Sequence, residues 1–224
     1  MKGLIIAIDG PSGAGKGTIS RTLSDTLNYR HIDTGAMYRA VAWKAMHDGL
    51  ALNDEADVAA LARRADIIVE GGAGGGSVSI DGHDVTRTIR TPEIDNAAAA
   101  VARLPGVREI LVERQRSMGE QGGIVMEGRD IGTVVFPNAD VKIYLDASTE
   151  ERARRRANDA AHSGGQAGQA AVAESIQARD RSDTTRPVSP LALAPDAIHI
   201  DTTGMPVQAV VDRVMALVRA RLDE

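Results

Sequence analysis

A glycine-rich segment near the N-terminus carries the residues whose types and spacing point most directly to chemistry. Residues 10–18 are close to the phosphate-binding pattern G-x-x-x-x-G-K-[ST]. Glycines let the backbone N–H groups turn inward around a phosphate chain, and Lys16 supplies a mobile positive charge. The segment therefore predicts a site for the phosphates of a nucleotide, made of Gly10, Pro11, Ser12, Gly13, Ala14, Gly15, Lys16, Gly17 and Thr18.

The segment departs from the usual pattern at one position. Gly17 follows Lys16, so the hydroxyl arrives one place later, at Thr18. In the usual pattern this hydroxyl ligates Mg²⁺. The shift leaves open whether Thr18 contacts a magnesium ion directly.

The flanking residues favour a strand, a turn and a helix around this segment. Residues 4–8 are all apolar, which suits a strand covered on both faces. After the turn, Ile19, Leu23 and Leu27 recur every four residues and give a helix an apolar stripe that faces the sheet. This context argues against the alternative, a glycine-rich turn with a chance lysine.

The rest of the chain alternates short apolar runs with helical segments. Further strands are predicted at residues 29–33, 124–127, 141–146 and 198–201. The alternation predicts an α/β fold, a P-loop three-layer sandwich with a central, mostly parallel five-stranded sheet. Because right-handed crossovers bring the carboxyl ends of parallel strands to one edge, ligands are expected at that edge.

Between residues 63 and 85 the pattern changes to short β-rich runs. A glycine-rich stretch and Asp81-Gly82 separate these runs, and Asp-Gly is typical of a hairpin turn. The sequence therefore predicts a small antiparallel β insertion, and a surface hairpin without function is the alternative. The predicted division of the chain is a core domain of residues 1–62 and 86–224 and an inserted hairpin of residues 63–85.

Composition limits the classes of function. The chain of 224 residues fits one α/β domain with insertions, and its net charge of −5 argues against broad nucleic-acid or membrane surfaces. It contains no cysteine, which excludes disulfides and thiolate chemistry. There is no leader-like segment and no apolar run of membrane-spanning length, so a cytoplasmic location is expected.

Arginines in the second half of the chain suggest a second phosphate-bearing ligand. The guanidinium group stays charged and binds phosphate oxygens in pairs. Arg179, Asp183 and Arg186 are spaced i, i+4, i+7 and would share one face of a helix. The alternative is a ladder of ion pairs within that helix. For Arg154 and Arg155 we expect only solvated or weak surface pairs.

Four segments in this order resemble the bacterial cytidylate kinases, a branch of the nucleoside monophosphate kinases. They are residues 8–18, the Asp-Thr-Gly-Ala-Met-Tyr-Arg segment 33–39, the Gly-Arg-Asp-Ile-Gly-Thr-Val-Val-Phe-Pro segment 128–137, and residues 179–186. The resemblance covers essentially the whole chain. It implies ATP-dependent phosphorylation of CMP and dCMP, a helical lid at about residues 147–168, and a monomer with small-molecule partners only.

The resemblance also implies roles for individual residues. ATP would be the phosphoryl donor and Mg²⁺ would arrive with the nucleotide, with no metal site made by the protein alone. Residues 10–18 would hold the ATP phosphates. The catalytic residues would be Lys16, Arg129, Arg179, Arg152 and Arg156. The residues that bind the acceptor nucleotide would be Thr34, Arg39, Arg108, Arg129, Asp130, Arg179, Asp183 and Arg186.

Asp130 and Arg108 would read the base. Cytosine offers an N4 amino donor that a carboxylate accepts, whereas uracil presents a carbonyl at the same place. A buried polar group left unmatched rejects such an analogue strongly. Arg108 would donate to the pyrimidine O2 or N3. The alternative for Asp130 is a structural role as the buried partner of Arg129.

Two positions depart from the family pattern. Ala99 stands where a serine commonly contacts cytosine, and Glu127 stands where an aspartate is frequent. Glu127, Asp9 and Asp146 are the candidates for orienting a magnesium-bound water. For Asp146, capping of the helix that follows is the alternative.

Two other functions remain open at this point. One is a kinase for UMP or another small acceptor, and the other is a nucleotide-dependent switch or ATPase. The chain lacks an Asn-Lys-x-Asp segment for guanine, and a switch would leave the second arginine-rich site unexplained. ATP consumption that requires a monophosphate would separate a kinase from a switch.

Overall fold

A parallel five-stranded sheet forms the centre of the protein, as predicted. The computed structural model describes residues 3–71, 76–159 and 168–223. The strand order is β2-β6-β1-β7-β8, and all four neighbouring pairs are parallel. The strands are β1 (Ile5–Asp9), β2 (Arg30–Asp33), β6 (Ile124–Gly128), β7 (Val141–Asp146) and β8 (Ile198–Asp201).

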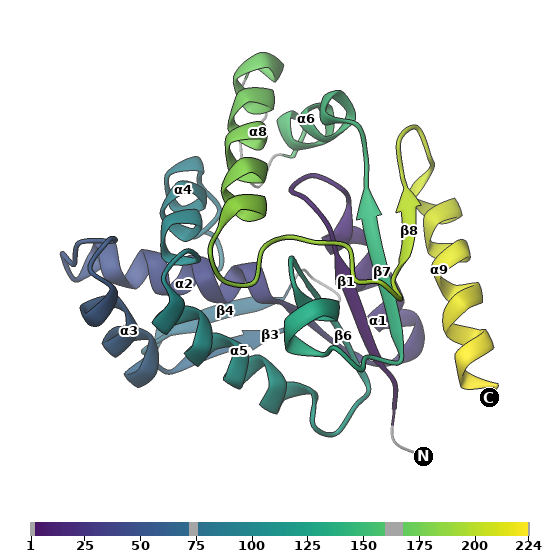
Figure 1. Cartoon of the computed structure of the whole chain (residues 1–224), viewed down its shortest axis with the longest axis horizontal. Coiled ribbons are helices and arrows are strands. Elements are labelled where there is room, and N and C mark those ends of the chain that lie inside the picture. Colours follow the sequence, from purple (N-terminus) through teal and green to yellow (C-terminus); the bar gives the residue numbers. More distant parts are fainter. Residues whose placement is uncertain (1–2, 72–75, 160–167, 224) are drawn as a thin grey trace.

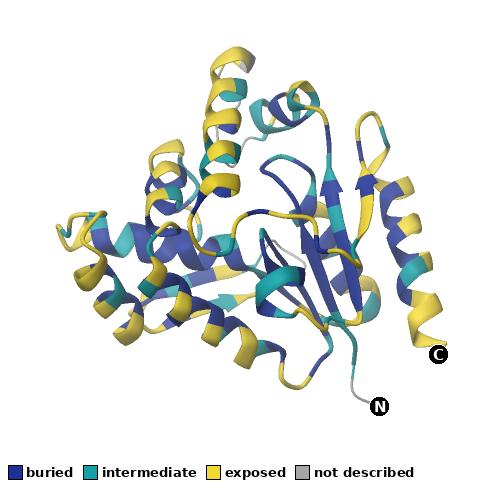
Figure 2. Cartoon of the chain, in the orientation of Figure 1, coloured by how far each residue is buried: buried dark blue, intermediate teal, exposed yellow. Residues whose placement is uncertain are grey.

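Helices cover both faces of this sheet, which makes three layers (Figure 1). On one face α1 and α9 pack on Ile6, Ile8 and Val125. On the other face α5 and the π-helical turn η1 pack on Ala7 and Met126. The central strands are buried almost throughout (Figure 2). The helices named here are α1 (Lys16–Leu27), α5 (Pro105–Gly119), η1 (Ile131–Val135) and α9 (Val207–Leu222).

The predicted insertion is a three-stranded antiparallel sheet of β3 (Ile67–Glu70), β4 (Ser77–Ile80) and β5 (His83–Asp84). Asp81 and Gly82 both have positive φ, at 48° and 79°, as the tight Asp-Gly turn requires. Most of the predicted glycine-rich connection lies outside the described residues.

The inner face of this small sheet packs on the neighbouring helices. Ile67, Val78 and Ile80 share one apolar cluster with α2, α3, α4 and α5. Side-chain caps set the starts of α2 and α4: Asp33 accepts from Ala36 N, and Thr91 accepts from Ile94 N. The helices not yet named are α2 (Thr34–His47), α3 (Glu55–Arg64) and α4 (Pro92–Val101).

Two helices, α6 (Thr149–Ala157) and α8 (Gln169–Thr185), stand over the carboxyl edge of the central sheet (Figure 1). α8 ends at Thr185, and Arg186 is extended with φ −64° and ψ 144°. The prediction that Arg186 shares a helix face with Arg179 is therefore wrong. Pro187 follows Arg186 and disfavours a helical conformation for it.

Among the described residues, no helix combines the length and apolarity needed to cross a bilayer.

Candidate active site

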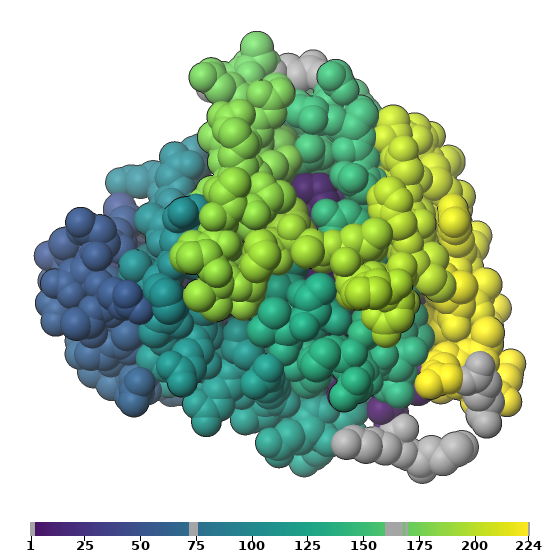
Figure 3. All heavy atoms as spheres, in the orientation of Figure 1, coloured from purple at the N-terminus to yellow at the C-terminus, as the bar shows by residue number. Residues whose placement is uncertain are grey.

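A cavity of about 670 Å³ opens at the carboxyl edge of the parallel sheet, where ligands were expected. Its wall includes the glycine-rich loop, the ends of β2 and β6, α2, and residues of α6 and α8. In the space-filling view, purple atoms of the N-terminal segment are visible between α8 and α6 (Figure 3). All but three of the site residues predicted from the sequence line this cavity. Gly10 and Pro11 precede the lining part of the loop, and Arg152 contacts the loop through the carbonyl oxygen of Ser12.

The glycine-rich loop is shaped by close backbone contacts. Gly10 has φ 145°, and a Cβ there would lie 1.9 Å from the carbonyl oxygen of Leu145. At Gly13, with φ 80°, a Cβ would lie 2.9 Å from the carbonyl oxygen of Arg152. The first residue of α1 is Lys16, so the positive end of the helix dipole faces the loop. This arrangement provides the anion-binding geometry that the sequence predicts.

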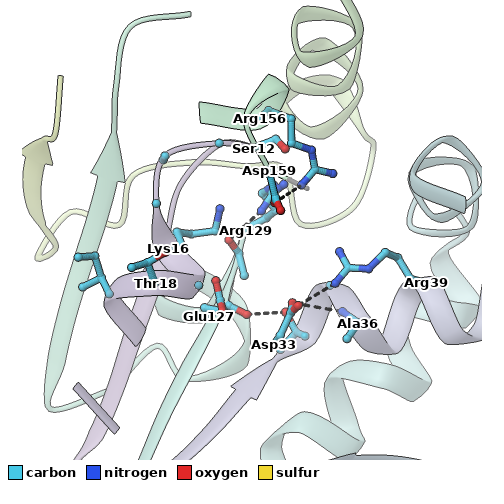
Figure 4. Close-up of a pocket in the computed structure, with 18 of the residues that line it drawn as sticks. Ser12, Lys16, Thr18, Asp33, Ala36, Arg39, Glu127, Arg129, Arg156 and Asp159 are labelled. Atoms are coloured by element: carbon cyan, nitrogen blue, oxygen red, sulfur yellow. Dashed lines mark hydrogen bonds and ion pairs between the residues drawn. The ribbon is translucent and has the colours of Figure 1, made fainter. Parts of the chain in front are cut away.

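Lys16 is buried at the floor of the cavity (Figure 4). Its Nζ donates to the carbonyl oxygens of Gly10 and Pro11, both at 2.8 Å. Burial, followed by the charge of Arg129, lowers the pKa of Lys16 to about 7. A phosphate chain that entered the loop would give this ammonium an anionic partner.

Glu127 is the carboxylate that faces the loop. Its Oε1 would lie 3.4 Å from a Cβ on Gly17, and the same oxygen is 2.9 Å from His31 Nε2. His31 is a residue that the sequence reasoning missed. The parallel register pairs His31 with Val125 and Asp33 with Glu127, and so brings His31 close to Glu127. This proximity can be predicted only once the order of the strands is known.

The two other candidate carboxylates have different surroundings. Asp9 accepts from Ile131 N at 2.8 Å and from Gly132 N at 2.7 Å, so it holds the start of η1. Burial raises the pKa of Asp9 to about 6. Asp146 accepts from the amide of its own neighbour, Ala147, and the cap of α6 is Ser148. The alternative that Asp146 caps this helix is therefore wrong.

The end of β2 presents Thr34 and Arg39 to the cavity. Thr34 Oγ1 donates to the carbonyl oxygen of Glu127 at 2.8 Å. Arg39 Nη2 donates to Asp33 Oδ2 at 2.7 Å (Figure 4). Although burial opposes ionisation, the Arg39 guanidinium holds the pKa of Asp33 well below its usual range.

Arg108, Asp130 and Arg186 form a buried network beside α2. Asp130 Oδ2 accepts from Arg108 Nη2, and Asp130 Oδ1 lies 3.3 Å from Arg186 Nη2. The guanidinium carbon of Arg108 lies 5.4 Å from the centre of the Tyr38 ring, and Arg108 is 2% exposed. Removing Asp130 would leave Arg108 buried without its carboxylate, which is costly.

The alternative that Asp130 partners Arg129 is wrong. Arg129 Nε instead donates to Asp183 Oδ2 at 2.8 Å. Burial opposes ionisation of Asp183, but Arg129 and then Arg179 lower the pKa of this carboxyl. Arg179 pairs with Asp95 of α4, whereas Asp183 pairs with Arg129 and, at 3.9 Å, with Arg186. The alternative of an ion-pair ladder is therefore right for Asp183 and Arg186 and wrong for Arg179.

The arginines of α6 differ in their surroundings. Arg152 is buried and donates to Ala147 O, Ser12 O and Asp180 Oδ2, at 2.9, 3.1 and 2.6 Å. Arg156 Nη2 donates to Asp95, which also pairs with Arg179 at 3.1 Å. Asp95 and Asp180 were missed because acidic residues at these positions read as ordinary surface charges.

Arg154 and Arg155 were both expected to be surface residues. Arg154 is exposed and pairs with Glu151, as expected. The same expectation is wrong for Arg155, because its guanidinium donates to Thr202 Oγ1 at 2.9 Å and to Thr202 O at 2.7 Å. A region of the cavity beyond the loop was missed with it, lined by Arg155, Thr202, Met205, Pro206 and Val207.

Several buried donors point to a ligand. Within the described residues, Nε of Arg39, Arg108 and Arg179 has no hydrogen-bond partner. A buried donor without a partner costs free energy, so such groups mark places that a ligand fills. All three arginines line the same cavity.

Comparison with known proteins places this geometry in a family. A family model described as cytidylate kinase matches residues 6–220. A cytidylate kinase of Desulfitobacterium hafniense is 48% identical over 222 residues, covering 99% of this chain and 95% of the relative. One from Pelotomaculum thermopropionicum is 51% identical over 216 residues and covers 96% of each chain. One from Bacillus subtilis is 46% identical over 220 residues and covers 98% of each.

A solved structure of a gluconokinase from Sinorhizobium meliloti is similar in fold. The TM-score is 0.51 at 14% identity, and the match covers 99% of this chain and 93% of that one. At this identity the likeness concerns the fold alone.

Proposed function

Because the chain belongs to the cytidylate kinase family, we propose that it transfers the terminal phosphoryl group of ATP to CMP and dCMP, giving ADP and CDP or dCDP. The observation that carries the proposal is one cavity with two cationic ends. Lys16 and the loop form one end, Arg39 of α2 and Arg108 of α5 line the other, and Arg129 lies near enough to Lys16 to lower its pKa. Two phosphate-bearing ligands bound together would use both sets of cations, whereas a single ligand would leave one set without a phosphate.

The glycine-rich loop is the donor end. Its amides and Lys16 hold the phosphates of ATP, with the negative charge near the N-terminus of α1. The adenine lies over the region of Arg155, Pro206 and Val207, where a guanidinium plane and apolar atoms offer stacking surfaces.

The acceptor end binds the monophosphate through arginines. Arg39 and Arg129 bind the phosphate, with Thr34 beside them. Arg179, Asp183 and Arg186 enclose the ribose, the phosphate and the base edge. The carboxylates that now pair with Arg39 and Arg129 keep these guanidiniums in place, because a paired arginine still has donors for a second anion.

Base choice depends on the Arg108–Asp130–Arg186 network. Asp130 accepts from the N4 amino group of cytosine, and Arg108 donates to O2 or N3. Uracil would place a carbonyl against Asp130, and the mismatch disfavours UMP. Ala99 lines the cavity where relatives commonly have a serine, so water or another side chain replaces that contact.

Magnesium bound to the ATP phosphates would neutralise part of their charge. Glu127 fits the role of orienting a metal-bound water, because its carboxylate faces Gly17 at the loop. Asp9 fits less well, since both its oxygens accept backbone N–H groups. Thr18, the hydroxyl-bearing residue that follows Lys16 and Gly17, also lines the cavity.

The residues of this chain act by alignment and charge compensation. Lys16, Arg129 and Arg179 face the transferring group from different sides, and the acceptor phosphate is already ionised, so no general base is required. Arg152 and Arg156 on α6 belong to a lid of about residues 147–168 that excludes water. Residues 63–85 are the inserted part of the acceptor side, and the enzyme works as a monomer.

The test is a coupled assay of ADP release with ATP and Mg²⁺, offering CMP, dCMP, UMP, AMP, GMP and no acceptor in parallel. We expect strong turnover with CMP and dCMP. Equal turnover with UMP would keep the kinase but remove the account of base choice. ATP loss that ignores the acceptor would instead indicate an ATPase or switch.

A further inference from the structure

Asp95 joins two arginines that belong to different helices. It lies in the first turn of α4, and its carboxylate pairs with Arg156 of α6 and with Arg179 of α8. Its side chain is 12% exposed. No role for Asp95 follows from the glycine-rich loop, from the base-reading network or from the segments that carry the family resemblance.

The position of α4 gives this contact a meaning for ligand binding. α4 packs beside α2 and α8 (Figure 1), and Ala99, one turn after Asp95, lines the cavity. α6 carries the lid arginines. Asp95 therefore links the wall of the acceptor end to the helices that close over the phosphates.

The two arginines differ from Arg152 in what holds them. Arg152 donates to two backbone carbonyls as well as to Asp180, so its place is fixed by the loop itself. Among the described residues, the ion pairs of Arg156 are with Asp95 and Asp159, and that of Arg179 is with Asp95. The ion pairs that hold Arg156 and Arg179 are therefore with carboxylates, whereas Arg152 is also held by backbone carbonyls.

We propose that Asp95 is a latch that holds Arg156 and Arg179 in the nucleotide-free protein and gives them up to substrate phosphate. The proposal rests on the proposed function, because the competing ligand is a nucleotide phosphate. A carboxylate and a phosphate offer a guanidinium the same kind of anionic oxygen, so each displaces the other from it. Asp95 is a positioning residue that acts through two arginines.

The surrounding charge supports an exchange of anions. Burial is the main cause that lowers the pKa of Arg156. The charge of Asp95 raises this pKa, and the charges of Arg179 and Arg39 lower it. Without Asp95, these cations would face one another with less compensation. An arriving phosphate would then gain more from binding, since no carboxylate has to leave first.

The test compares Asp95→Asn with Glu93→Gln by calorimetry, using a non-hydrolysable ATP analogue, CMP and cytidine. Glu93 is an exposed acidic residue in the same first turn of α4, so its variant controls for net charge and the helix dipole. We expect Asp95→Asn to bind both phosphate ligands at least about threefold tighter, and the gain to shrink as salt screens the charges. Cytidine binding stays unchanged, and Glu93→Gln behaves like wild type.

In steady state, Asp95→Asn lowers the KM for nucleotide without raising kcat, because tighter ground-state binding does not favour the transition state. Unchanged or weaker binding of both nucleotides would overturn the latch. Wild-type protein that binds neither nucleotide would overturn the proposed function instead. If thermal melting shows that Asp95→Asn does not fold, Asp95→Ser, which also removes the charge, is measured against the same expectations.

Discussion

The two ends that we propose for the cavity offer different groups to an anion. At the donor end the loop offers backbone amides, and Lys16 donates hydrogen bonds to two carbonyl oxygens of the loop itself. At the acceptor end nearly every cation pairs with a carboxylate, as in Arg39–Asp33 and Arg129–Asp183. The donor end is therefore a local backbone structure, and the acceptor end is a network of side chains from distant parts of the chain.

This difference suggests that the two ends recognise different parts of their ligands. A backbone cradle recognises triphosphate shape and tolerates little change of backbone angle. A network of paired side chains distinguishes one base from another, because each unmatched buried group is penalised. Variants at the two ends should therefore fail in different ways.

Removing the cation of the donor end should have the largest effect. We expect Lys16→Ala to reduce kcat by a factor of about 10²–10³, the loss typical of one preorganised group that stabilises transition-state charge. Thermal unfolding should change little, since the hydrogen bonds that Lys16 Nζ makes to the described residues go to carbonyls of its own loop. Lys44→Ala, at a half-buried position of α2 where the lysine pairs with Asp48 outside the cavity, is the matched control. Wild-type turnover in a folded Lys16→Ala variant would remove the loop from the mechanism.

Breaking the base-reading network should affect the acceptor selectively. We expect Asp130→Ala to lower kcat/KM for CMP about 100-fold and to narrow the preference for CMP over UMP, while affinity for an ATP analogue stays near wild type. The variant leaves Arg108 and Arg186 without this carboxylate, so it should also lower the free energy of unfolding by about 3 kcal/mol. Equal losses of CMP and ATP affinity would assign Asp130 a structural role.

The pKa of Lys16 predicts a pH dependence at the donor end alone. With a pKa of about 7, much of Lys16 is neutral above that pH in the free protein. A bound phosphate chain favours the ammonium and raises its pKa, so binding takes up a proton and ATP affinity falls as pH rises from 7 towards 9, by up to about tenfold per unit. Below pH 7 this uptake disappears.

Calorimetry of an ATP analogue at pH 8, in buffers of different ionisation enthalpy, measures the proton uptake. Lys16→Arg is the matched variant, because arginine keeps its charge at every working pH. Binding by wild type without proton uptake, or the same uptake in Lys16→Arg, would contradict the prediction.

Restoring a family contact should have the smallest effect. We expect Ala99→Ser to tighten CMP binding by about two- to tenfold, the contribution of one neutral hydrogen bond. ATP affinity should not change. Ala100→Ser, at the exposed neighbouring position, controls for the effect of a hydroxyl on α4. A change in ATP affinity equal to that in CMP affinity would show that position 99 acts on the whole cavity.

The comparison of the two ends also explains what the sequence could predict. The parallel sheet, the inserted hairpin and the glycine-rich loop depend on local patterns, namely apolar runs, Asp81-Gly82 and the residues 10–18, and the structure contains all three. A local motif carries its own context, so it can be read before the fold is known.

Partners across the acceptor end could not be predicted in the same way. Asp130 meets Arg108 and Arg186, and Asp95 meets Arg156 and Arg179, over separations of 22 to 84 residues. Such pairs depend on how helices pack, which periodicity does not specify. The wrong expectation for Arg155 has the same origin, since its partner Thr202 lies just after β8, 47 residues along the chain.

The most direct test of two distinct ends is a titration of CMP into wild-type protein that is already saturated with a non-hydrolysable ATP analogue. If the cavity holds two nucleotides at once, CMP binds with a stoichiometry of one, and its affinity is equal to or higher than in the protein alone. If the analogue abolishes CMP binding, both ligands share one end, and the account of separate donor and acceptor sites is wrong.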